Sequence, residues 1–292
     1  MKILAVVVTH NRCELLKQCV ACIEKQIVPC DILVIDNDSI DETYQFIKKK
    51  ESNTFFFQRM PENLGGAGGF NAGMRWGVEH EYDYIWVMDD DTLVQKETLS
   101  QLLTADKTLE GNYGFISSTV LWTDGSPCKM NVHHPPKKKQ NSRLSDQGIY
   151  RIDQSTFVSC LFPVSIVKKY GLPIREFFIW GDDMEYTRRI AVRGKEPCYW
   201  IQKSIVVHAM TSNNGSAIAT DDETRLDRYR YAYRNENYLY RQEGIAGFLH
   251  YTVRCAVHIV RVLLYAPNKR GKRIRIIVGK YFEGMHFNPK IE

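Results

Sequence analysis

The alternation of strand-like and helix-like segments in the first third of the chain limits the fold more than any other feature. Apolar and amphipathic runs follow one another, strand first: Ile3–Thr9, Glu14–Lys25, Asp31–Asp36, Glu42–Lys50, Thr54–Arg59, Gly69–Glu79 and Tyr84–Met88. This β-α-β order predicts an α/β fold with a doubly wound, mostly parallel sheet. Ligands of such sheets bind at the carboxyl ends of the strands.

The second half of the chain is less regular. We expect an exposed loop, two strands and two helices at Asn131–Gln147, Thr156–Pro163, Ile201–Val207, Ser165–Tyr170 and Asp182–Val192. Thr211–Thr224 is rich in Gly, Ser and Asn, which predicts a mobile segment. Long helical stretches follow it, so we divide the chain into an α/β domain, residues 1–224, and a C-terminal helical region, residues 225–292.

Three adjacent aspartates, Asp89, Asp90 and Asp91, come directly after the strand Tyr84–Met88. Neighbouring carboxylates repel one another, and a divalent cation removes that repulsion. Because alternate residues of a strand point to the same side, Asp89 and Asp91 can share one cation. Carboxylate oxygens suit Mg²⁺ and Mn²⁺, which commonly bridge to phosphate. The alternative is an acidic turn in which Asp91 or Thr92 caps the next helix.

A histidine at a strand end and a pair of aspartates at a helix start are further candidate site residues. His208 closes the strand Ile201–Val207, where an imidazole either completes a cation site or is an ordinary strand-end histidine. Asp182 and Asp183 begin a helix, whose dipole favours ionised carboxylates. We favour Asp183 as a general base that takes a hydroxyl proton. The alternative is that this pair only caps the helix, with Asp182 at the N-cap and Glu185 completing a capping box.

A glycine-rich segment, Asn63–Asn71, lies between a strand and a helix. Glycines let the backbone approach a ligand closely, and the following helix N-terminus attracts phosphate or sugar oxygens. The segment has no P-loop motif, and no dinucleotide-binding fingerprint follows the first strand. We expect a ligand-binding turn here, with a merely flexible turn as the alternative.

Taken together, these motifs resemble the family 2 glycosyltransferases of the GT-A fold, in order and in spacing. The resemblance covers roughly residues 1–210 and looks closest to the galactofuranosyltransferase branch, although related rhamnosyltransferases look similar overall. It rests on VVVTHNR, VIDNDS, NLGGAGGFNAGM, WVMDDD, FFIWGDDMEYTRR and a later His. The resemblance implies a GT-A sheet and transfer of a sugar from a nucleotide diphosphate.

The resemblance also implies a role for each matching residue. Asp183 is the base, and Trp180 and Asp182 shape the acceptor and sugar pocket. The cofactor, Mn²⁺ or Mg²⁺, is held by Asp89, Asp91 and His208. The donor is bound by Thr9, Asn11, Arg12, Asp36, Asn63, Gly65, Gly66, Asp89 and Asp90. This chain departs from the branch at Gly181, where better-known members have Trp directly before the paired aspartates, and His10 is left without a role.

The C-terminal region is basic. From Arg225 to Glu292 there are 14 Lys and Arg against 5 Asp and Glu, a net charge of about +9 in a chain whose total is +5. Within Ile245–Ala266, Arg254, His258 and Arg261 share one face of an otherwise apolar helix, and the basic cluster that follows comprises Lys269, Arg270, Lys272, Arg273 and Arg275. Such a helix can lie in an anionic bilayer surface. Its charges disfavour a membrane span, and packing against the α/β domain or a second copy is the alternative.

We therefore expect an inverting, metal-dependent glycosyltransferase of cell-surface polysaccharide synthesis, acting on a glycan or lipid-linked acceptor. UDP-galactofuranose is the expected donor, and dTDP-rhamnose is the alternative. A sugar nucleotidyltransferase is disfavoured because THNRCE, not a basic glycine-rich segment, follows the first strand. A non-catalytic sugar-binding protein is a remote alternative.

The expected location is the cytoplasm, at the inner face of the cell membrane. The cysteines are scattered, and the apolar N-terminal run is too short for a signal peptide or a span. We expect membrane-surface contact through the tail, a homo-oligomer as an option, and no nucleic-acid partner, because no recognition motif accompanies the charge.

Overall fold

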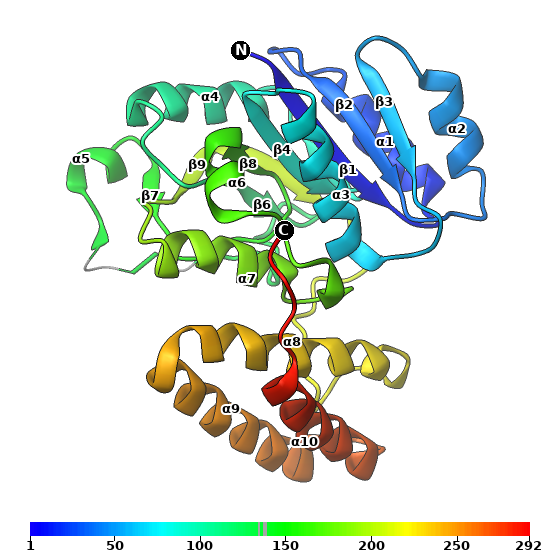
Figure 1. The fold of residues 1–292 in the computed structure, drawn as a ribbon, viewed down its shortest axis with the longest axis vertical. Helices are drawn as coiled ribbons and strands as arrows, with labels where there is room; N and C mark the ends of the chain where they lie inside the picture. The colour runs from blue at the N-terminus through cyan, green and yellow to red at the C-terminus, as the bar shows by residue number, and fades with distance from the viewer. Residues whose placement is uncertain (134, 137–138) are drawn as a thin grey trace.

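The protein is described by a computed structural model that covers residues 1–133, 135–136 and 139–292; His134, Lys137 and Lys138 of the predicted loop lie outside the described residues. Figure 1 shows an α/β part with a layer of helices beneath it. The strands are β1 (Ile3–Thr9), β2 (Asp31–Asp36), β3 (Phe55–Arg59), β4 (Tyr84–Asp89), β5 (Thr92–Val94), β6 (Ile116–Leu121), β7 (Ile149–Arg151), β8 (Cys160–Pro163) and β9 (Tyr199–His208).

The helices fall into two groups. Those of the α/β part are α1 (Cys13–Ile23), α2 (Thr43–Lys50), α3 (Gly65–Glu79), α4 (Thr98–Leu109), α5 (Ser142–Ser145), α6 (Val164–Tyr170), the 3₁₀ turn η2 (Arg175–Phe177), α7 (Asp182–Arg188) and the π-helical turn η3 (Arg189–Arg193). The helical region contains η4 (Glu223–Arg228), α8 (Tyr229–Gln242), α9 (Gly244–Tyr265) and α10 (Arg270–His286).

The described strands form one sheet in the order β3-β2-β1-β4-β8-β6-β9-β5, with β7 paired to β9. The first four strands are parallel, as the alternation predicts. Beyond β4 the sheet is mixed, because β8 runs antiparallel to both β4 and β6, and β5 runs antiparallel to β9. The α/β prediction is confirmed, and beyond β4 only β6 and β9 pair in parallel among the described strands.

Strand β1 shows why the sheet needs helices on both faces. All seven of its residues are buried. Ile3, Ala5 and Val7 pack in a core that also contains residues of α1, α2 and α4. Leu4, Val6 and Val8 point the other way, as alternation along a strand requires, into a core with α3 and α6. A strand buried on both faces is typical of a doubly wound sheet.

The glycine-rich segment is helical, so the predicted turn before a helix at Gly69 is wrong. Helix α3 begins at Gly65, and Gly69, Gly73 and Gly77 recur on one of its faces. A Cβ atom on Gly69 would lie 2.4 Å from Val8 Cγ1, and one on Gly73 would lie 2.3 Å from Val6 Cγ1. These glycines therefore let α3 approach β1 closely, and the approach brings the N-terminus of α3 to the carboxyl end of that strand.

The helical region has a core of its own. Buried side chains from η4, α8, α9 and α10 pack together, Leu226, Tyr233, Tyr251 and Ile277 among them. Arg273, which the sequence places in the basic cluster, is buried and donates hydrogen bonds to the carbonyl oxygens of Ile218 and Asp221. It therefore ties α10 to the segment before η4 and adds nothing to the charged surface.

The last residues of the chain return to the α/β part (Figure 1). The backbone N–H of Leu172 donates to the carbonyl of Glu292 at 2.8 Å, and the Glu292 carboxylate pairs with Arg75 of α3 and lies 3.6 Å from Arg175. The helical layer is thus connected to the α/β part at both of its ends.

The close approach of α3 to β1 yields a stability prediction. Gly73→Ala should lower the free energy of unfolding by about 1–3 kcal/mol, because the added methyl group overpacks the contact with Val6. Gly279→Ala in α10 is the matched control, since nothing lies within 4 Å of its added Cβ, and it should stabilise by up to about 1 kcal/mol. Urea denaturation of both variants gives the comparison, and equal effects would contradict close packing at Gly73.

Candidate functional site

One cavity of about 780 Å³ lies at the carboxyl ends of β1 and β4. The α/β part supplies one side of its wall and the helical region supplies the other. Most residues assigned from the sequence lie on this wall: Thr9, Arg12, Asn63, Gly65, Gly66, Asp89, Asp90, Asp91, Trp180, Asp182, Asp183 and His208. Residues that are up to 199 positions apart in the sequence therefore face one space.

Asn11 and Asp36 do not lie on the cavity wall. Asn11 accepts a hydrogen bond from the backbone of Ile40, and the Asp36 carboxylate accepts one from the backbone of Ser39. Asp36 is fully buried. Both side chains order the loop after β2, whose residue Asn37 does line the cavity.

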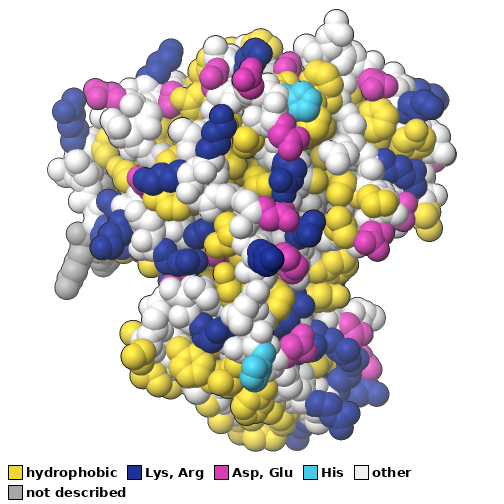
Figure 2. Space-filling model, in the orientation of Figure 1, with side chains coloured by type: hydrophobic (Ala, Val, Ile, Leu, Met, Phe, Trp, Pro, Cys, Tyr) yellow, Lys and Arg dark blue, Asp and Glu magenta, His cyan; other side chains and the backbone are white. Residues whose placement is uncertain are grey.

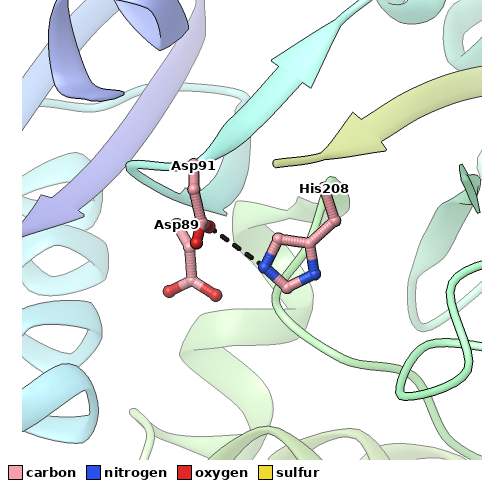
Figure 3. Close-up of side chains that lie close together, drawn as sticks. All are labelled: Asp89, Asp91 and His208. Atoms are coloured by element: carbon pink, nitrogen blue, oxygen red, sulfur yellow. Dashed lines mark ion pairs between the residues drawn. The ribbon is translucent and has the colours of Figure 1, made fainter. Parts of the chain in front are cut away.

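Asp89, Asp91 and His208 converge at the end of β4 (Figure 3). One ligand atom from each lies within 4.8 Å of the others. The antiparallel pairing of β5 with β9 brings this about, because it sets Thr92, next to Asp91, opposite His208. His208 Nε2 lies 3.0 Å from Asp91 Oδ1, which is a buried oxygen.

The other ring nitrogen of His208 is oriented by Asn131, whose side-chain oxygen lies 3.0 Å from Nδ1. A proton on Nδ1 satisfies that contact and directs the lone pair of Nε2 toward the aspartates. Two carboxylates and an imidazole that is held in this way fit a divalent cation such as Mn²⁺ or Mg²⁺. No pattern in the sequence marks Asn131 as a site residue.

Asp90 points away from this triad, toward β1. It accepts hydrogen bonds from the Thr9 hydroxyl at 2.8 Å and from the Arg12 guanidinium at 2.7 Å. Arg12 also donates to Asp91 at 2.6 Å. A cationic side chain from the β1–α1 junction thus neutralises part of the charge of the aspartate run.

Burial and mutual repulsion separate the pKa values of these groups. Burial, together with the charge of Asp91, raises the pKa of Asp89 to about 7. Burial alone would raise that of Asp91, but the hydrogen bond and charge of His208, together with Arg12, lower its pKa to about 2. Burial opposes the charged form of His208, and Asp91 nevertheless raises its pKa to about 10. Asp91 and His208 therefore form a buried ion pair near neutral pH.

Asp182 and Asp183 begin α7 on the cavity wall. The Asp183 carboxylate accepts a hydrogen bond from the backbone of Met184 at 2.7 Å. Burial raises the pKa of Asp183 to about 6. Burial and the neighbouring Asp183 charge raise the pKa of Asp182 well above its usual range. Burial therefore raises the pKa of Asp182 more strongly than that of Asp183, and Asp183 is the carboxyl group of the pair that loses its proton more readily.

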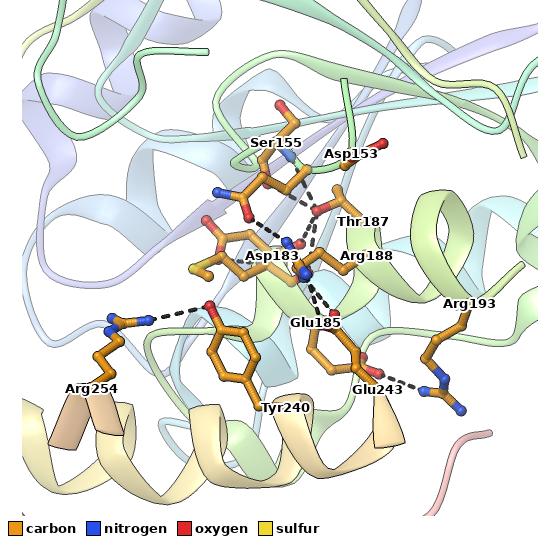
Figure 4. Close-up of polar contacts among 12 residues, drawn as sticks. Asp153, Ser155, Asp183, Glu185, Thr187, Arg188, Arg193, Tyr240, Glu243 and Arg254 are labelled. Atoms are coloured by element: carbon orange, nitrogen blue, oxygen red, sulfur yellow. Dashed lines mark hydrogen bonds and ion pairs between the residues drawn. The ribbon is translucent and has the colours of Figure 1, made fainter. Parts of the chain in front are cut away.

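Contacts on both sides hold α7 in place (Figure 4). The Thr187 hydroxyl donates to the Asp183 carbonyl at 2.7 Å and is also bonded to Ser155. Arg188 forms two hydrogen bonds to Glu243, at 2.6 and 2.8 Å, at the junction of α8 and α9. An arginine–carboxylate pair with two hydrogen bonds fixes direction as well as distance, so this bridge holds α7 against the helical region.

The segment before α7 has an unusual backbone. Phe178, Trp180 and Gly181 all have left-handed φ angles, of 63°, 62° and 90°. The side-chain amide of Asn235, from α8, donates to the carbonyl oxygens of Phe177, Ile179 and Trp180. Strained residues of this kind persist when their surroundings hold them in place. Here they turn Trp180 onto the cavity wall, where its ring packs edge-on against Tyr229 at 5.0 Å.

The helical region contributes cavity residues that the sequence did not predict as site residues. Five basic side chains line the cavity: Arg225, Arg228, Arg254, His258 and Arg261. Helical spacing shows that Arg254, His258 and Arg261 share a face, and a membrane was the expected partner of their helix. The structure turns this face toward the cavity.

Comparison with known proteins agrees with this arrangement. The chain matches the sequence pattern of glycosyl transferase family 2 over residues 4–158. It is 29% identical over 273 residues to galactofuranosyltransferase GlfT1 of Mycolicibacterium smegmatis, which covers 84% of this chain and 85% of that protein. It is 26% identical over 269 residues to GlfT1 of Mycobacterium tuberculosis, with 85% and 84% covered. The family resemblance drawn from the motifs is confirmed.

Solved structures agree in fold. The crystal structure of Staphylococcus aureus TarS 1–349 superimposes with a TM-score of 0.55 at 15% identity, over 97% of this chain and 71% of that one. GalNAc-T7 with UDP, GalNAc and Mn²⁺ superimposes with a TM-score of 0.57 at 14% identity, over 84% and 51%. The GT-A prediction is thereby confirmed.

The geometry of the triad predicts a pH-dependent affinity for metal. Mn²⁺ should bind more tightly as the pH rises from about 6 to 8, because His208 and Asp89, whose pKa values are raised to about 10 and about 7, must lose their protons to become ligands. Calorimetric titration in two buffers of different ionisation enthalpy measures both the affinity and the protons released.

A pair of variants checks that this affinity belongs to the triad. Asp91→Asn should weaken Mn²⁺ binding by about tenfold or more, whereas Asp124→Asn, in an exposed turn, should not change it. An affinity that is independent of pH, with no proton release, would count against the triad.

Proposed function

The chain belongs to glycosyl transferase family 2, and on that premise we propose that it transfers galactofuranose from UDP-galactofuranose, with inversion, to a hydroxyl group of a glycan or lipid-linked acceptor. The similarity to GlfT1 along most of both chains supports this donor. The observation that carries the proposal is one cavity that holds the Asp89–Asp91–His208 triad and, on a different element, the ionised Asp183.

The α/β side of the cavity is the proposed donor side. Thr9, Asn63, Gly65, Gly66 and Asp90 border it. When bound by Asp89, Asp91 and His208, Mn²⁺ or Mg²⁺ supplies positive charge beside the departing diphosphate. Arg12 presents a guanidinium at the same place, and its fork geometry suits phosphate oxygens.

Two residues assigned to the donor act indirectly in this proposal. Asn11 and Asp36 order the loop after β2, and that loop carries Asn37 to the cavity wall. Their contribution is to hold the border of the nucleotide pocket in place.

Asp183 is the proposed base. Its carboxylate takes the proton of the acceptor hydroxyl as that oxygen bonds to the anomeric carbon, and the bond from that carbon to the diphosphate oxygen breaks. Asp182 holds its proton more strongly beside it, because burial raises its pKa well above the usual range, and in its protonated form it can donate a hydrogen bond to sugar. Trp180 supplies an apolar ring on the same wall.

The base assignment predicts a separation of binding from transfer. Asp183→Asn should reduce transfer by at least about a thousandfold, because the amide cannot take the proton, while UDP still binds in the presence of Mn²⁺. Wild-type activity should fall as the pH drops through about 6, because the raised pKa of Asp183 leaves the base protonated below that value. Radiolabelled sugar transfer and UDP calorimetry measure the two effects.

Two comparisons complete this test. Asp146→Asn, at an exposed position, should behave as wild type. If the Asp183→Asn variant still transferred sugar at the wild-type rate, Asp183 would not be the base. A panel of UDP-galactofuranose and dTDP-rhamnose identifies the donor, and transfer from neither sugar nucleotide would contradict the proposed function.

We also propose that the enzyme lies in the cytoplasm, on the inner surface of the membrane, with residues 1–224 for catalysis and residues 225–292 for docking. Helix α9 is the one helix among the described residues that is long and apolar enough to cross a membrane. Its face with Arg254 and Arg261 lines the cavity, so we place it flat on the bilayer. Its exposed large aliphatic residues are Ile245, Leu249, Val253, Val257, Val260, Leu263 and Leu264.

Charge near α9 supports an anionic bilayer as the partner. Lys269, Arg270 and Arg275 are exposed at the start of α10. Figure 2 shows apolar side chains along the bottom of the molecule, over the helical layer, with Lys and Arg side chains beside them on the right. Basic residues that flank an apolar strip are typical of helices bound to anionic lipid.

Vesicle flotation tests the docking surface. The protein should float with vesicles of phosphatidylglycerol, and the double variant Val253→Glu, Val260→Glu should lose about tenfold or more of that binding, because both side chains are more than half exposed on α9. Ile27→Glu, an exposed residue of the α/β part, is the control and should float normally. Unchanged flotation of the double variant, or its conversion of a dimer to a monomer, would instead favour a second copy as the partner.

A further inference from the structure

Five basic residues of the helical region line the cavity. Arg225 and Arg228 come from η4, and Arg254, His258 and Arg261 come from α9. We refer to these five residues as the basic wall. The cavity carboxylates of the α/β part, at Asp89–Asp91 and Asp182–Asp183, come from other elements, so the cavity has an acidic side and a basic side.

Two charges of the basic wall are offset within the protein. Arg254 lies 3.1 Å from the carboxylate of Glu236, and Arg225 lies 3.2 Å from that of Asp221. Arg228 and Arg261 have no carboxylate within 4.0 Å among the described residues. The basic wall therefore has about two positive charges, those of Arg228 and Arg261, that no carboxylate of the described residues neutralises.

The pKa of His258 is affected by the positive charge of the basic wall. Its Nδ1 lies 2.7 Å from the hydroxyl of Tyr233. Burial, followed by the charges of Arg254 and Arg261, lowers the pKa of His258 to about 4. A neutral imidazole between two guanidinium groups indicates a positive potential at this point of the cavity, which an anionic ligand would offset.

The wall also adjoins the residues proposed to receive the acceptor. The Arg225 guanidinium lies 5.8 Å from the centre of the Trp180 ring, and that ring packs on Tyr229 of the helical region. The proposed donor phosphate site lies on the other side, at the carboxyl ends of β4 and β9, where Arg12 already provides a cation. A second phosphate site is thus available beside the acceptor.

The two faces of α9 add a second property of the ligand. The row Arg254, His258 and Arg261 borders the cavity, and the apolar side chains of the same helix, including Val253 and Val260, face outward. A molecule bound at the wall could leave the cavity along an apolar surface. A ligand that suits both the basic face and the apolar face of α9 carries a phosphate group between a sugar and an apolar chain.

We propose that the basic wall binds the phosphate or diphosphate group of an amphiphilic acceptor and so selects acceptors that carry one. This inference rests on the proposed function, since it takes the cavity to be the site of sugar transfer. Arg228 and Arg261 make the main contacts, because no carboxylate of the described chain neutralises them. Arg225 and Arg254, which are held by Asp221 and Glu236, shape the wall around them.

Calorimetry on the full-length protein tests the wall. The protein is first saturated with UDP and Mg²⁺ to fill the donor side, and octyl phosphate or 1-octanol is then titrated as the probe. Octyl phosphate should bind and 1-octanol should bind much more weakly. The double variant Arg228→Gln, Arg261→Gln should lose affinity for octyl phosphate by roughly tenfold for each arginine, the effect of one charge-assisted hydrogen bond.

Matched variants test whether a loss of affinity comes from unfolding or from a general change of surface charge. Both arginines are exposed, so the double variant should keep the melting temperature of the wild type. Arg228→Lys, Arg261→Lys keeps the charge and should recover most of the affinity. Arg230→Gln, on α8 two residues beyond Arg228 and paired with Asp227, does not line the cavity and should bind the probe as wild type does.

The other sources of the phosphate give different results. Lost affinity for UDP with unchanged affinity for octyl phosphate would assign the wall to the donor and overturn the proposal. Equal affinity for inorganic phosphate and octyl phosphate would make it a site for free phosphate and would also overturn it. Equal binding of octyl phosphate by the wild type and the double variant would do the same.

This assay requires no turnover, so its outcome is separate from that of the proposed function. A protein that transfers no galactofuranose but binds octyl phosphate through Arg228 and Arg261 would refute only the proposed function. Transfer with the double variant at an unchanged acceptor KM would refute only the basic wall.

Discussion

The repulsion among three carboxylates at the end of β4 is the constraint on which the rest of the site depends. Asp90 and Asp91 are buried, and Asp89 is half-buried, so their charges cannot be screened by water alone. The fold surrounds them with cationic groups from other elements: Arg12 from the β1–α1 junction and His208 from β9. Both partners reach the aspartates only because β1 is paired with β4 and β9 with β5.

The position of Asp183, the proposed base, depends on the helical region as well as on the sheet. Asn235 of α8 bonds three carbonyl oxygens of the strained segment that precedes Asp182, and Arg188 of α7 is bridged to Glu243. Removing the helical region would leave left-handed Phe178 and Trp180 without the amide that holds them. Residues 225–292 therefore hold the proposed base in position, besides any role at a membrane.

The sequence predicted the parts of the site that depend on local pattern. A buried strand that runs into aspartates, and paired aspartates at a helix start, placed Asp89, Asp91 and Asp183 because strand ends meet at one edge of a sheet. It misread Gly65–Gly69 as a turn because low helix propensity argues against a helix, whereas the close approach of α3 to β1 favours glycine there. Asn131 carried no signal at all, since its role arises only from its contact with His208.

The basic wall shows where pattern reasoning reaches its limit and what the structure adds. Helical spacing establishes that Arg254, His258 and Arg261 share a face, but it does not say what that face meets. An amphipathic helix on a bilayer normally turns its charges toward water or lipid headgroups. In α9 the contacts with α8 and α10 turn them toward the cavity and leave the apolar face outside. If that apolar face lies on a membrane, the guanidinium row stands between the bilayer and Asp183, which is the path that an anionic, lipid-linked acceptor would have to take.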